Sequence, residues 1–177
     1  MTIDQDWLMT QCEDLILKAE RLLGRRDPNW SLGSVRRNPD GDYPRLHVYP
    51  ERGYADILLS SQLDEGNRTA VRYELAHECL HMLDPCTAKE STNLCEGLAA
   101  YFQYKETRQR TKHEKYLPAL EAVERQWVRL QGAVRHCRLH AVERKPMHMI
   151  GFTDIEPWFL NSSDVEGDLR FLTKAFD

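Results

Sequence analysis

The chain lacks the sequence features that place a protein in a membrane or on a nucleic acid. Its 177 residues contain no apolar run near the roughly 20 residues that a membrane-spanning helix needs. Acidic residues occur early, at Asp4 and Asp6, which argues against a signal peptide. The net charge is −4 and no long basic block is present, so nucleic-acid binding has no electrostatic support. We therefore expect a cytoplasmic protein without membrane or nucleic-acid partners.

Cysteines are few, and their spacing is irregular. The chain has 5 of them, an odd number, and no Cys-x-x-Cys pair. This pattern argues against a disulfide framework and favours reduced thiols, as in a cytoplasm. A second zinc site built from Cys79, Cys86 and Cys95 is an alternative, but the missing Cys-x-x-Cys pair argues against it.

The composition is that of an ordinary globular protein. Hydrophobic residues make up 41% and charged residues 29% of the chain. Its length suits one domain, residues 1–177, with a sizeable core. The densest basic stretch, residues 135–145, also contains Glu143, and we expect it to be a solvated helix face. The oligomeric state is not predictable from these features.

The hydrophobic pattern predicts an α+β fold. Residues 4–23 have helical spacing, with Gly24 as a plausible cap. Short strands separated by turns are expected at residues 30–35, 46–49 and 55–59. Further helices are expected at residues 67–83, at residues 92–108 with Ser91 or Thr92 as the cap, and at residues 118–130 with Gly132 beyond the end. Two capping boxes, residues 163–166 and the weaker 153–156, predict short C-terminal helices.

The most informative segment is the run His77-Glu78-Cys79-Leu80-His81. Because a helix turns about 100° per residue, the two histidines lie one turn apart on one face, close enough to bind one ion. Glu78 lies at the edge of that face, where it can accept a proton from a metal-activated water. Cys79 points to the opposite side and is expected in the core. His-Glu-x-x-His on a helix is a zinc-hydrolase motif, although an amphipathic helix with two surface histidines would show the same letters.

Glu96 supplies a candidate third ligand. Catalytic zinc usually has three protein ligands, and two histidines with one glutamate are a known set. Gly97, Ala99 and Ala100 leave little side-chain bulk around Glu96. We expect this to let the two helices approach closely, although small residues also suit helix packing in general.

These two segments together resemble the gluzincin metallopeptidases. The stretch from Asn93 to Phe102 is similar to the glutamate helix of the aminopeptidase N family, and the resemblance covers about residues 45–105. It implies a zincin-like fold in which a small sheet, of three strands or more, packs on three helices and a mostly helical C-terminal part. It also implies one Zn²⁺ per chain, bound by His77, His81 and Glu96, with Glu78 as the general base. The substrate-anchoring Gly-x-Met-x-Asn motif is missing, so the specificity of the aminopeptidases is not implied.

Other candidate site residues carry weaker signals. Asp84, three residues after His81, is a possible hydrogen-bond partner of a ligand histidine, or a loop-start residue before Pro85. Tyr73, one turn before His77, either lines the cleft or packs.

A donor for the oxyanion is also needed. His136, His140, His148 and Tyr116 are the candidates, and His148 is favoured because its neighbours are apolar.

The sequence as a whole predicts a small zinc metallopeptidase that hydrolyses peptides or proteins. We expect an extended substrate to pair with an edge strand at residues 55–60. Two alternatives stay open. One is a zinc-binding regulatory or interaction module with little catalysis, against which the intact Glu78 argues. The other is a zinc hydrolase of a non-peptide amide.

Overall fold

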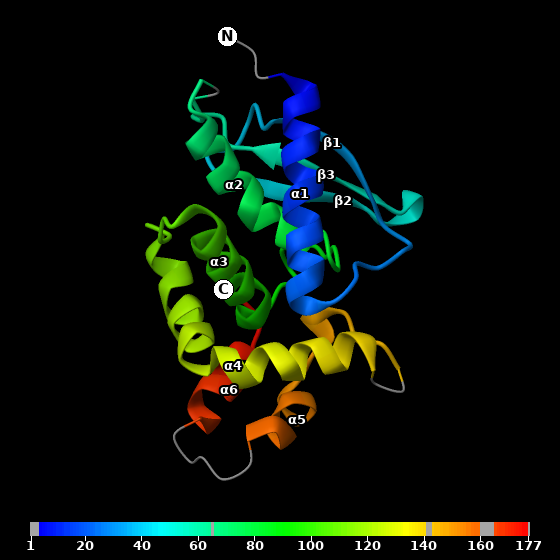
Figure 1. Ribbon diagram of the computed structural model, residues 1–177, viewed down its shortest axis with the longest axis vertical. Helices are drawn as coiled ribbons and strands as arrows, with labels where there is room; N and C mark the ends of the chain where they lie inside the picture. The colour runs from blue at the N-terminus through cyan, green and yellow to red at the C-terminus, as the bar shows by residue number, and fades with distance from the viewer. Residues whose placement is uncertain (1–3, 65, 141–142, 160–164, 177) are drawn as a thin grey trace.

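The computed structural model describes residues 4–64, 66–140, 143–159 and 165–176. Within these ranges, six α-helices and one three-stranded mixed sheet form an α+β fold, as predicted. In chain order the elements are α1 (Gln5–Leu23), β1 (Ser31–Arg37), β2 (Arg45–Tyr49), β3 (Tyr54–Leu59), α2 (Arg68–His81), α3 (Asn93–Thr107), α4 (Leu117–Leu139), α5 (Phe152–Ile155) and α6 (Glu166–Leu172). Short 3-10 turns lie at Pro50–Arg52, Glu114–Tyr116, Met147–Met149 and Glu156–Phe159. The sheet lies with α1 and α2 in the upper part of Figure 1, and α4 to α6 form the lower part.

Side-chain caps and a glycine set the limits of the first three helices. Asp4 caps α1, which ends at Gly24, where φ is +96°. Asn67 caps α2 by accepting a hydrogen bond from the backbone N–H of Ala70. Of the two caps expected for α3, Thr92 is the one in place. Each cap satisfies a backbone donor that the first helical turn leaves free, so these limits follow from the sequence.

The fourth helix is longer than predicted. Instead of ending before Gly132, α4 continues to Leu139. A Cβ atom at position 132 would lie 3.3 Å from the ring of Trp158, so the glycine makes room for that ring. A glycine in a helix costs roughly 0.5–1 kcal/mol relative to alanine, and tertiary packing outweighs this here.

The prediction of a solvated face at residues 135–145 is wrong for Arg138, which is fully buried. Its Nε donates to Asp84 Oδ2 over 2.6 Å. Its two terminal nitrogens donate to backbone oxygens at the ends of α1 and α2, namely those of Leu23, Gly24, Arg25 and Leu83. Arg138 therefore joins the segments at and just after the C-terminal ends of α1 and α2 to α4.

Of the two capping boxes predicted near the C-terminus, residues 163–166 and 153–156, only the second lies fully within the described residues. Ser163 and Asp164 lie outside the described residues. The helix α5 begins at Phe152, and the Asp154 carboxylate accepts a hydrogen bond from the N–H of Gly151 over 2.8 Å. Thr153 is therefore inside the helix, and its prediction as a cap is wrong.

The sheet has the order β1-β3-β2, with β1 parallel and β2 antiparallel to β3. The predicted substrate strand, residues 55–60, is thus mostly β3, the central strand. Its backbone groups already pair with strands on both sides, so β3 offers no free edge and that prediction is wrong. The edge strand on the α2 side is β2, which contacts α2.

One hydrophobic cluster runs through the described part of the chain and includes side chains from the sheet and all of the longer helices. Cys79 is fully buried in it, as expected. Arg72 of α2 adds polar links, because it donates to Gln11 and Asp14 of α1 and to Glu106 of α3. No helix within the described ranges has both the length and the apolar character to cross a membrane.

Gly97 of α3 does not serve the close approach to α2 that the sequence predicts. A Cβ atom there would lie 2.6 Å from the backbone oxygen of Ala119 in α4. Gly97 therefore permits close packing of α3 on α4 rather than on α2. Ala99 and Ala100 are fully buried.

Candidate metal centre

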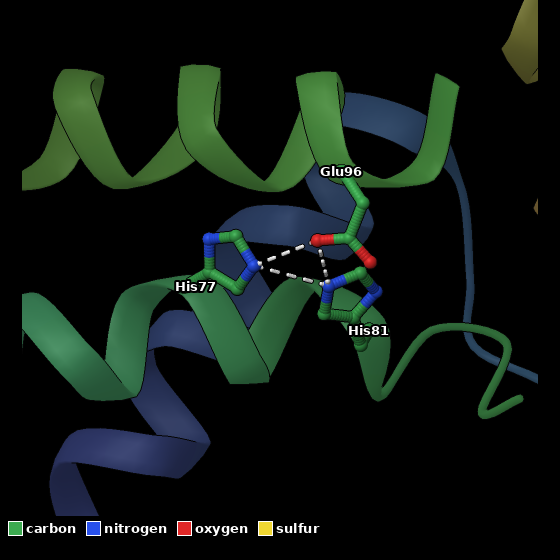
Figure 2. Close-up of side chains that lie close together, drawn as sticks. All are labelled: His77, His81 and Glu96. Carbon is green, nitrogen blue, oxygen red and sulfur yellow. Dashed lines mark hydrogen bonds and ion pairs between the residues drawn. The ribbon is translucent and has the colours of Figure 1, made fainter. Parts of the chain in front are cut away.

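Two histidines of α2 point toward the same place. His77 and His81 are separated by one helical turn, and their Nε2 atoms lie 3.3 Å apart. Both side chains are buried, because α2 packs between the sheet, α1 and α3. Figure 2 shows the two imidazoles projecting from α2 toward α3.

Glu96 completes the group from the first turn of α3. Its Oε2 lies 3.2 Å from His77 Nε2 and 3.5 Å from His81 Nε2. Its other oxygen, Oε1, accepts a hydrogen bond of 2.6 Å from the Ser91 hydroxyl. Ser91 therefore fixes the carboxylate so that one oxygen faces the two histidines, as Figure 2 shows for Glu96.

The three atoms fit a metal ion. Ligand atoms about 2.0–2.2 Å from a tetrahedral ion lie roughly 3.3–3.6 Å from one another. The observed separations of 3.2, 3.3 and 3.5 Å match this spacing. Within the described part of the chain, His77, His81 and Glu96 are the one set of three such residues with ligand atoms this close. The structure thus shows a buried group that can hold a metal ion.

The electrostatics favour the charged forms of Glu96 and His81 despite their burial. Burial opposes ionisation of Glu96, but His81 and His77 outweigh it and hold the pKa of this carboxyl well below its usual range. Burial likewise opposes the charge on His81, yet Glu96 and Glu78 raise its pKa to about 9. The Glu96 carboxylate thus stabilises the buried positive charge of His81, and it would stabilise the charge of a bound cation in the same way.

Glu78 lies beside the group without being part of it. The side chain is buried and lines two adjoining cavities of about 80 and 150 Å³. Its carboxylate has no hydrogen-bond partner among the described residues. Burial raises the pKa of Glu78 above its ordinary value, while His77 and His81 act against this shift. The position suits a group that exchanges protons with a molecule in the cavities.

An aromatic wall closes one side of the centre. The ring of Tyr116 lies edge-on to that of His77, with centroids 5.4 Å apart, and stacks on Phe176 at 5.2 Å. The Lys115 ammonium lies over both aromatic rings. The C-terminal segment is held in place by the hydrogen bond from Phe176 N–H to the carbonyl of Ser91.

Some of these residues were not foreseen. Phe176 lies far from the motif in the sequence and has no pattern of its own. Ser91 was considered only as a helix cap, and no sequence signal pointed to its hydrogen bond with Glu96. Both lie at the centre because the C-terminal segment pairs with residues just before α3, through a bridge between Thr92 and Ala175.

Only some of the other candidate site residues lie near the metal centre. Tyr73 lines the cavity of about 80 Å³, together with His77 and Glu78. His148 lines another cavity, which shares Cys86 and Thr87 with the cavity of about 150 Å³ but does not include Glu78 or the three candidate ligands. His136 and His140 lie on and just after the last turn of α4, where His136 packs against Trp158. Tyr116 is thus the one of the four oxyanion candidates that the structure places at the centre.

Asp84 has a full set of partners elsewhere. Its carboxylate accepts hydrogen bonds from Arg138, Arg144 and the backbone N–H of Met147. These contacts account for the buried carboxylate as part of the connection between α2 and α4. None of its side-chain hydrogen bonds in the described ranges goes to His77 or His81.

Comparison with known proteins adds no assignment: no family model, curated protein or solved structure matches the chain. The class of the protein must therefore be argued from the geometry of the centre.

Proposed function

We propose that the chain is a small zinc metallopeptidase of the gluzincin type. The observation that carries this proposal is the convergence of His77 Nε2, His81 Nε2 and Glu96 Oε2 at 3.2–3.5 Å, beside an unpaired Glu78 carboxylate. Two imidazoles and one carboxylate are a ligand set of catalytic zinc, which leaves one position open. A purely structural metal site has no need of Glu78.

The residues of the chain divide the chemistry among them. Zinc, when bound, supplies Lewis acidity toward a substrate carbonyl and a water. Glu78 accepts the proton of the attacking water and passes it to the leaving amine. The Tyr116 hydroxyl is our candidate for the donor to the developing oxyanion, because its ring packs against His77 at the same cavities. Ser91 holds Glu96 in position.

The substrate is an extended peptide that lies along β2. This strand is at the edge of the sheet, and Arg45 and Leu46 line the cavity that contains the metal ligands. An extended chain can pair its backbone with such an edge, which fixes the scissile bond without recognising one particular sequence.

The test compares the wild-type protein with Glu78→Gln in a screen of peptide cleavage. The variant should retain its zinc, because Glu78 is not a ligand, and should lose about 10²–10⁴-fold in rate, since it lacks the general base. Glu121→Gln is a matched control, because Glu121 is an exposed glutamate on α4 that lines neither of the two cavities. Equal rates for Glu78→Gln and the wild type would exclude the assigned mechanism.

A further inference from the structure

The two cavities beside the candidate metal centre differ in charge. They share four residues, Pro44, His77, Glu78 and Tyr116, so they adjoin at the proposed general base. Beyond these shared residues, the smaller cavity is lined by Asp42 and Glu74, and no Lys or Arg is among its described lining residues. The larger cavity is lined by Arg45 and Lys115 and by the metal ligands.

None of these four charged side chains is used in an ion pair within the described ranges. Asp42 accepts a hydrogen bond from the Ser61 hydroxyl, and Glu74 accepts two from Ser60. Lys115 contacts only aromatic rings, and Arg45 has no side-chain partner in the described part of the chain. Most other arginines near the core contact a carboxylate, as Arg72 does. Within the described ranges, the charges along the cleft are thus not neutralised by an opposite charge of the chain itself.

The chain segment between these charges links the two cavities. Asp42, Tyr43 and Pro44 line the smaller one, and Pro44, Arg45 and Leu46 line the larger one. A peptide lying along this segment therefore passes an acidic wall on one side of the scissile bond and a basic wall on the other. A dication held by two neutral imidazoles and one carboxylate leaves one net positive charge, which adds to the basic side.

We propose that the cleft selects peptides with opposite charges on the two sides of the scissile bond. A basic side chain occupies the cavity with Asp42 and Glu74, and an acidic side chain occupies the cavity with Arg45 and Lys115. This inference rests on the proposed function for the position of the scissile bond, but it concerns binding and can be measured without cleavage.

The experiment measures the affinity of five end-blocked hexapeptides for zinc-loaded Glu78→Gln protein. The peptides differ only at the two central residues, which are Asp-Lys, Lys-Asp, Ala-Ala, Asp-Asp or Lys-Lys. One of the two opposite-charge peptides should bind about threefold to tenfold more tightly than Ala-Ala, as expected for partly exposed ion pairs. The advantage should shrink at 1 M salt, where the screening length falls to about 3 Å. The preferred order reports the direction of the peptide in the cleft.

Charge reversals assign the effect to the named side chains. Lys115→Glu should remove the preference for an acidic residue, and Asp42→Lys should remove that for a basic one. Lys112→Glu and Asp40→Lys are matched controls, because these exposed residues do not line either cavity. Equal affinity for all five peptides, or equal effects of Lys115→Glu and Lys112→Glu, would overturn the inference.

The result also separates this inference from the proposed function. If the wild-type protein cleaves all five peptides with the same kcat/KM, the peptidase assignment holds and the charge selection is refuted. If the opposite-charge peptide binds preferentially but the zinc-loaded wild-type protein cleaves none, the charge selection holds and the peptidase assignment fails.

Discussion

Replacing Arg138 by methionine should destabilise the protein strongly. The guanidinium and the Asp84 carboxylate form an ion pair of 2.6 Å, and their side chains are 0% and 1% exposed. Removing one partner of a buried ion pair typically costs about 3–5 kcal/mol, because the other charge stays buried. Arg144 also contacts the Asp84 carboxylate, at 2.7 Å, and compensates for part of this charge. We therefore expect a loss at the lower end, about 3 kcal/mol.

Backbone groups add to this loss. Arg138 also donates to four carbonyl oxygens, at distances of 2.7–3.3 Å, of which only that of Leu83 has another donor, the N–H of Asp27, in the described part of the chain. A buried acceptor left without a donor costs about 1–3 kcal/mol, although water can reach some of these positions after the substitution. Methionine keeps much of the apolar stem, so the change isolates the polar contacts from the packing.

Unfolding in urea, followed by circular dichroism, measures the effect. The midpoint should fall while the slope stays near that of the wild type. Arg135→Met is the control, because Arg135 is exposed and donates to a single carbonyl, that of Arg21. A loss of less than about 1 kcal/mol for Arg138→Met, or a loss equal to that of the control, would refute this account of the buried arginine.

Three further variants test the hydrogen bond of Ser91 and the surroundings of two helical glycines. Ser91→Ala should weaken zinc binding by about 10–100-fold, because Glu96 loses the hydrogen bond that orients it; competition with a chelator measures this, and an unchanged affinity would contradict the role of Ser91. Gly97→Ala should destabilise the protein by about 1–3 kcal/mol, because the new methyl group meets the Ala119 backbone. Gly167→Ala, with open space around the new Cβ, should instead stabilise it by about 0.5–1 kcal/mol in the same unfolding assay. Equal signs for these two changes would contradict the packing described for α3 and α4.

The sequence was sufficient to predict the local structure around the candidate centre. Helical periodicity and caps located α1, α2 and α3, and the spacing of His77 and His81 within one helix fixed their geometry. The group with Glu96 was expected from the ligand chemistry of zinc, and the structure brings these three residues together. Such predictions succeed because helix caps and the two histidines involve residues close together in the sequence. The third ligand follows from the known ligand set of two histidines and one glutamate.

Features that depend on distant contacts were not predictable. The order of the strands decides which one is at the edge, and nothing within residues 55–59 shows that β3 is paired on both sides. A glycine predicts a helix end at Gly132, because its contact with Trp158 joins residues far apart in the sequence and leaves no local signal. Arg138 looked solvated for the same reason, since its partners belong to α1 and to the segment after α2.

The position of the aromatic wall has the same explanation. Tyr116 and Phe176 meet because the C-terminal segment returns to the start of α3. The apolar neighbours of His148 in the sequence favour it as an oxyanion donor, but the fold places it in a cavity that does not include Glu78 or the candidate ligands. Adjacent residues do not determine the surroundings of His148, because the cavities are lined by residues that are far apart in the sequence.

The most direct test of the central claim is peptide cleavage as a function of zinc added back to chelator-treated protein. We expect no cleavage without metal, a rise that reaches a plateau at about one equivalent of zinc, and no recovery for His77→Ala. Cleavage that does not depend on zinc would contradict the account. So would a protein that binds one equivalent of zinc at His77, His81 and Glu96 and cleaves no peptide.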